Sequence, residues 1–73
     1  MAETPAPTGT PDEHYDLILV LQQALEDAVR YQCFAEDSRK AGDDELADFF
    51  AELGDSDKEI AERAKKLLLA RLR

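Results

Sequence analysis

Residues 31–50 read YQCFAEDSRKAGDDELADFF, and this stretch decides the fold because it contains the turn between two helical segments. Gly42 is typical of the residue that follows a helix end, and Arg39 and Lys40 before it suit the negative end of the helix dipole. Asp43 or Asp44 then provides the N-cap of a second helix. A connection this short makes the two helices run antiparallel as neighbours.

Apolar residues recur at intervals of three and four on both sides of this turn, which predicts amphipathic helices over about 12–41 and 44–72. The residues expected in the core or at a dimer interface are Leu17, Leu21, Leu25, Ala28, Tyr31, Leu46, Phe49, Phe50, Leu53, Ile60, Ala64 and Leu67. Gly54 interrupts the second helix, and a capping-box spacing follows it. The apolar positions keep a seven-residue interval across this glycine, so we expect a continuous helix.

The length of the chain favours association with a second copy. Its 73 residues allow one domain, and so small a domain usually needs a disulfide, a metal or an oligomer for stability. Cys33 is the single cysteine, which excludes an internal disulfide and argues against a structural zinc site. The apolar surface of each helix is also wider than one neighbour covers. We therefore expect an all-α hairpin over residues 12–73 that forms a homodimer, or a higher homo-oligomer, as an antiparallel four-helix bundle.

Composition and charge limit where the protein is expected to be located and what it is expected to bind. Residues 1–11 hold all three prolines, and we expect them to form a disordered arm. The net charge of -8 disfavours binding to nucleic acid or to anionic membranes. No apolar run is long enough to span a membrane, and residues 1–11 lack the basic and apolar segments of a secretory signal. We therefore expect a cytoplasmic protein.

The charges are distributed unevenly along the chain. Residues 12–57 carry 14 acids and 3 bases, whereas residues 58–73 carry 6 bases and 2 acids. In an antiparallel hairpin, the basic end of the second helix therefore lies beside the acidic start of the first. Four acid–base pairs have i,i+4 spacing and are expected to pair on the surface: Glu26–Arg30, Glu36–Lys40, Glu59–Arg63 and Glu62–Lys66.

Three segments, 31–35, 40–42 and 46–50, resemble the first helical hairpin of rubrerythrin-type, ferritin-like proteins, and the resemblance covers roughly residues 17–70. It implies a di-iron site with oxidoreductase or iron-handling chemistry. Such a site takes a glutamate from one helix and a Glu-x-x-His pair from the next. Laid on this chain, these positions fall on Ala24, Asp57 and Ile60, and the single histidine is His14. We therefore expect a ferritin-like hairpin that lacks the metal site and binds no cofactor.

Three functional interpretations follow. The first is a non-enzymatic, homodimeric module with a structural or protein-interaction role and no catalytic residues. The alternative is an iron-binding, di-iron oxidoreductase whose site is assembled at the dimer interface from Asp57, Glu26 and Glu59. The third is an adaptor whose open face receives the helices of another protein. Asp57 is the one acid on the predicted core line, and we expect it to be solvated or hydrogen-bonded.

Overall fold

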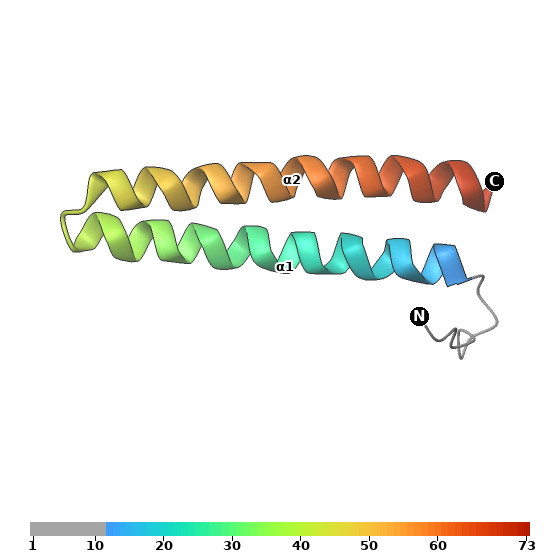
Figure 1. The fold of residues 1–73 in the computed structure, drawn as a ribbon, viewed down its shortest axis with the longest axis horizontal. Helices are drawn as coiled ribbons and strands as arrows, with labels where there is room; N and C mark the ends of the chain where they lie inside the picture. Colours follow the sequence, from blue (N-terminus) through green and yellow to red (C-terminus); the bar gives the residue numbers. More distant parts are fainter. Residues whose placement is uncertain (1–11) are drawn as a thin grey trace.

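The computed structural model describes residues 12–73, so the expectation for residues 1–11 lies outside the described part of the chain. Two helices, α1 (Asp12–Lys40) and α2 (Asp44–Leu72), lie side by side and antiparallel (Figure 1). The described residues contain no strand, so the expected all-α hairpin is confirmed. Each helix has 29 residues and is therefore about 44 Å long. We call the end with the connection the turn end, and the end where α1 starts and α2 finishes the open end.

Backbone hydrogen bonds close the connection between the helices tightly. The Gly42 N–H donates to the Arg39 carbonyl at 3.0 Å, and the Asp43 N–H donates to the Ser38 carbonyl at 2.9 Å. Gly42 has a φ of 79°, the left-handed conformation in which glycine has no steric penalty. The Asp43 carboxylate accepts from the Leu46 N–H at 3.1 Å. Of the two N-cap candidates, Asp43 therefore has this role.

The most buried part of the contact between the two helices is made by small side chains. The residues buried there, which we call the alanine seam, are Ala24, Ala28, Ala35 and Ser38 of α1 with Ala47, Gly54, Ala61 and Ala64 of α2. All six buried hydrophobic residues are alanines, and no large side chain of residues 12–73 is fully buried. Small residues let two helix backbones approach closely. The hairpin therefore has a close helix contact but little buried apolar surface of its own.

The α2 helix continues through Gly54, as expected from the seven-residue interval across it. Gly54 is one of the buried residues of the alanine seam and lies opposite Ala28 and Tyr31. Glycine at this position therefore allows the two helices to approach each other, and it does not end the helix.

The ion pairs of residues 12–73 lie within single helices and differ from the expected ones. Arg30 pairs with Asp27 at 2.7 Å, and Lys65 pairs with Glu62 at 2.9 Å. Both pairs have i,i+3 spacing, so the i,i+4 partners expected for Arg30 and Glu62 are wrong. On a helix, both spacings bring side chains within reach, and sequence alone does not determine which rotamer is taken. The hydrogen bond from Lys65 lowers the pKa of the exposed Glu62 carboxyl.

Candidate interaction surface

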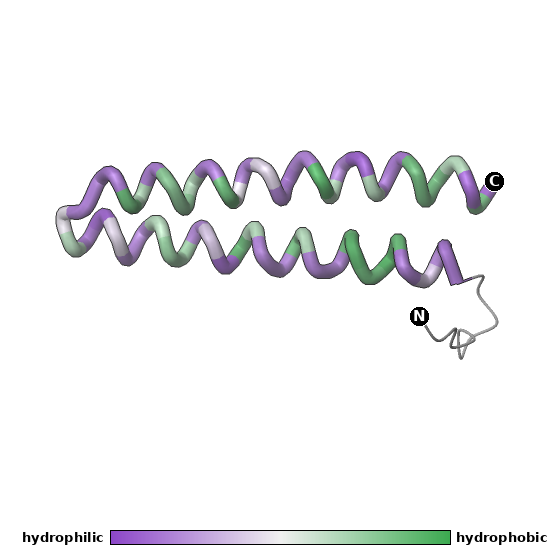
Figure 2. The backbone as a smooth tube through the Cα atoms, viewed as in Figure 1, coloured by the Kyte–Doolittle hydropathy of each residue, from purple (hydrophilic) through white to green (hydrophobic). Residues whose placement is uncertain are grey.

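The large apolar side chains lie mainly outside the alanine seam. Figure 2 shows hydrophobic segments recurring along both helices between hydrophilic ones. Of the residues expected in the core or at an interface, only Ala28 and Ala64 are buried in the single chain. Five are exposed: Leu25, Leu46, Phe49, Ile60 and Leu67. The others, Leu17, Leu21, Tyr31, Phe50 and Leu53, are half-buried. Most of the predicted set therefore remains available for contact with another molecule.

Many of these side chains share one side of the hairpin, which we call the apolar face. Its members are Leu17, Val20 and Phe34 of α1 with Leu46, Phe49, Leu53, Ile60 and Leu67 of α2. A groove on this side is lined by residues of both helices: Leu17, Val20, Ile60, Arg63, Ala64 and Leu67. Val20 and Phe34 are fourteen residues apart, and the α2 leucines and Ile60 are seven apart, so each set stays on one side of its helix. The apolar face therefore extends along most of the hairpin.

An aromatic cluster occupies the part of this face nearest the turn end. The ring of Phe34 in α1 lies edge-on to Phe50 of α2, with centroids 5.4 Å apart. Phe34 also contacts Tyr31 at 5.9 Å, and Phe50 contacts Phe49 at 5.7 Å. Such aromatic pairs contribute roughly 0.5–1.5 kcal/mol beyond the burial of their area. Phe49 is still 52% exposed, so the cluster presents an uncovered aromatic edge.

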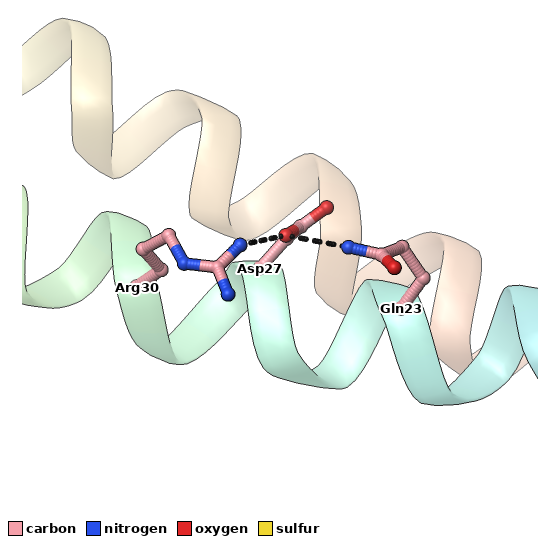
Figure 3. Close-up of polar contacts among 3 residues, drawn as sticks. All are labelled: Gln23, Asp27 and Arg30. Atoms are coloured by element: carbon pink, nitrogen blue, oxygen red, sulfur yellow. Dashed lines mark hydrogen bonds and ion pairs between the residues drawn. The ribbon is translucent and has the colours of Figure 1, made fainter.

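Two carboxylates lie at the middle of the apolar face. Asp27 and Asp57 are each one residue from the centre of their helix, residue 26 in α1 and residue 58 in α2. The two line a common groove with Val20, Gln23 and Ile60. One oxygen of Asp27 accepts from Gln23 Nε2 at 3.1 Å and from an Arg30 guanidinium nitrogen at 2.7 Å (Figure 3). We call Asp27 and Asp57 the midpoint acids; they divide the face into an aromatic and an aliphatic part.

This groove also holds the three positions that the ferritin-like resemblance assigns to metal ligands. Ala24, Asp57 and Ile60 all line it. The structure therefore brings together the positions predicted from the sequence, although two of them carry apolar side chains. Asp27 is a further acid in this groove that the sequence reasoning missed. Its spacing of seven residues from both Val20 and Phe34 was the signal that places it on this face.

The other two acids named for an iron site lie elsewhere. Glu26 and Glu59 are exposed, and Glu26 lines a separate surface depression on α1 with Leu25, Val29 and Arg30. Within residues 12–73, no three His, Cys, Asp or Glu side chains converge as a metal site requires. In this part of the chain, no helix is long and apolar enough to cross a membrane.

The opposite side of the hairpin is more polar. Gln32 and Glu36, two residues before and after Phe34, point nearly opposite to it at 100° per residue. They line a groove with Arg39, Asp55 and Lys58, whose floor is made by residues of the alanine seam. In its turn half the hairpin is therefore asymmetric, with an apolar face on one side and a groove bordered by charged and amide side chains on the other.

Charge divides the hairpin along its length. The half nearest the turn end, residues 27–57, carries ten acids and three bases. The open half, residues 12–26 and 58–73, carries six acids and six bases. The turn half therefore has a net charge of -7, and the open half has none.

In comparisons with known proteins, no family model matches the chain, and no curated protein or solved structure matches it either.

Proposed function

We propose that the chain is a non-enzymatic, cytoplasmic helical module that acts as a homodimer, with a structural or protein-interaction role. In this proposal, the apolar faces of two copies pack together into a four-helix bundle of ferritin-like type. The observation that carries it is the arrangement of the side chains: alanines are buried between the helices, whereas the leucines and phenylalanines are exposed or only half-buried.

The energetics of burial favour this assignment. Fully burying a Leu, Ile or Phe side chain contributes about 1.5–3 kcal/mol, whereas a methyl group contributes less than about 1 kcal/mol. Val20, Phe34, Leu46, Phe49, Ile60 and Leu67 retain between 38% and 52% of their exposure. Covering them contributes roughly 1 kcal/mol for each side chain. A second hairpin therefore supplies apolar burial that the alanine seam lacks, and folding and dimerisation should be coupled.

Sedimentation equilibrium tests the homodimer. The expected mass is twice the 8.2 kDa of the chain, and the melting temperature should rise with protein concentration because the dimer binds only folded chains. Phe49→Asp should abolish dimerisation, since it places a charge at the exposed edge of the aromatic cluster, which the proposed dimer would bury. The matched control is Val29→Asp, because Val29 is 64% exposed and does not belong to the apolar face; this variant should remain a dimer.

A stable, folded monomer at all concentrations would overturn the proposal. A folded monomer that captures helices of another protein would support the adaptor interpretation instead. If Val29→Asp removes dimerisation and Phe49→Asp does not, the dimer exists but uses the other side of α1.

The iron-binding alternative is tested separately. It requires that two copies assemble a site from Asp57, Glu26 and Glu59, or from the midpoint acids. Elemental analysis after loading with ferrous iron and desalting measures the metal retained for each chain. Stoichiometric iron that is lost in Asp57→Ala, with dimerisation preserved, would replace the non-enzymatic assignment with the iron-binding one.

A further inference from the structure

We infer that the two copies pack with the turn end of each over the open end of the other; this inference rests on the proposed homodimer. Two hairpins can meet face to face about a twofold axis in two ways. An axis along the helices places both turn ends together, with α1 on the partner's α2. An axis across the helices places the turn ends at opposite ends, with α1 on the partner's α1 and α2 on the partner's α2.

The charge distribution selects the second arrangement. With both turn ends together, two halves that each carry a net charge of -7 would lie against each other. With the turn ends at opposite ends, each acidic half lies against an open half whose six bases and six acids balance. Like charges placed side by side across an interface oppose association, and complementary ones favour it. The net charge of the whole chain is the same in both arrangements, so the difference arises from its distribution alone.

The midpoint acids determine how far one hairpin can slide along the other. Because Asp27 and Asp57 lie at the centre of the helices, an axis through the centre brings them against the same two residues of the partner. This central layer holds four carboxylates and the two Arg30 guanidinium groups that pair with Asp27, so two of the four like charges are offset within it. A shift by one or two turns would instead place carboxylates against apolar side chains, where a charge without a partner is unfavourable. The unshifted register also lays each aromatic cluster on the aliphatic part of the partner's face.

In this arrangement, Phe49 of one copy and Leu67 of the other lie at the same position along the helix axis. Phe49 lies nine residues before the centre at residue 58, and Leu67 lies nine residues after it. Both belong to the apolar face and are exposed in the single chain. An axis across the helices therefore places Phe49 of one copy opposite Leu67 of the other. Phe49 of the two copies would then be about 27 Å apart along the helices, at 1.5 Å per residue.

Disulfide trapping between differently substituted chains tests the arrangement. In a Cys33→Ser background, which removes the exposed native thiol, Phe49→Cys chains are mixed with Leu67→Cys chains and oxidised. A disulfide-linked heterodimer is expected, because a disulfide requires Cα atoms within about 7 Å of each other. A second mixture, Val20→Cys with Phe34→Cys, tests the predicted contact between the two α1 helices in the same way. Phe49→Cys alone should remain mostly unlinked.

The competing arrangement predicts a different pair. With both turn ends together, α2 lies on the partner's α1, so Phe49→Cys should link to Phe34→Cys in another chain. Linking of that pair, or no linking in the two expected mixtures of a sample that sediments as a dimer, would overturn the inference while leaving the homodimer intact. A sample that sediments as a monomer before oxidation would overturn the homodimer itself.

Discussion

Gly54 lies against Tyr31 across the alanine seam, and a Cβ added at Gly54 would stand 3.6 Å from the Tyr31 Cβ. It would also lie 3.7 Å from the Ala28 carbonyl oxygen, and both distances are ordinary van der Waals contacts. We therefore expect Gly54→Ala to stabilise the protein by about 0.5–1 kcal/mol, because glycine inside a helix is less favourable than alanine by this amount. Thermal or urea unfolding measures the change. A lower melting temperature would show that the helices do not tolerate the methyl group.

The same substitution at Gly42 should have the opposite sign. Gly42 adopts a φ of +79° in the turn, and a Cβ there would meet no other atom within 4 Å. The expected destabilisation of about 1–2 kcal/mol therefore comes from the left-handed backbone alone. Urea unfolding of Gly42→Ala and Gly54→Ala under identical conditions compares the two. Equal effects at the two glycines would contradict the assignment of one to a turn and the other to a helix contact.

Enlarging a residue of the alanine seam should separate the helices. Ala61 is 2% exposed, and Ala61→Leu should destabilise the protein by about 1–3 kcal/mol because the close contact has no room for the added atoms. Ala70 is on the same helix and exposed, so Ala70→Leu is the matched control and should change little. Chemical unfolding followed by circular dichroism measures both variants. A stable Ala61→Leu protein would mean that the large apolar residues can replace the small ones in the helix contact.

The N-cap of α2 provides a further test. Asp43→Ala removes the acceptor for the Leu46 N–H and should destabilise the protein by about 1 kcal/mol. Asp44→Ala keeps this hydrogen bond and loses only a charge in the first helical turn, so its effect should be smaller. Unfolding curves of the two variants at low and moderate salt distinguish them. If Asp44→Ala is the more damaging, the N-cap assignment is wrong.

The elements of the hairpin follow from short-range chemistry, and for this reason they could be predicted from the sequence. Gly42 and the bases before it mark the end of one helix, and Asp43 marks the start of the next. The continuity of α2 through Gly54 was predicted from the spacing of the residues around it. The two ion pairs were predicted with the wrong partners, because Arg30 and Glu62 can each reach residues three or four positions away.

It was harder to predict which side of each helix faces the other helix. In α2, the stripe of Leu46, Leu53 and Ile60 and the stripe of Ala47, Gly54 and Ala61 lie one residue apart. Hydrophobicity favours the larger residues for the interior, whereas close approach of two helices favours the smaller ones. The structure places the small stripe between the helices and leaves much of the large one exposed. Asp27 was missed for a related reason: it shares a side of α1 with Val20 and Phe34, where hydrophobicity does not predict an acid.

The alanine seam has a consequence for how such a chain can change over time. Small side chains fill the most buried part of the helix contact, and apart from the Phe34–Phe50 pair the large side chains lie mainly outside it. A substitution among the exposed large residues changes what the hairpin associates with and leaves the alanine seam itself unchanged. Single substitutions among these residues can therefore weaken the self-association of this chain or direct it toward another protein. A core filled with leucines would not tolerate such substitutions.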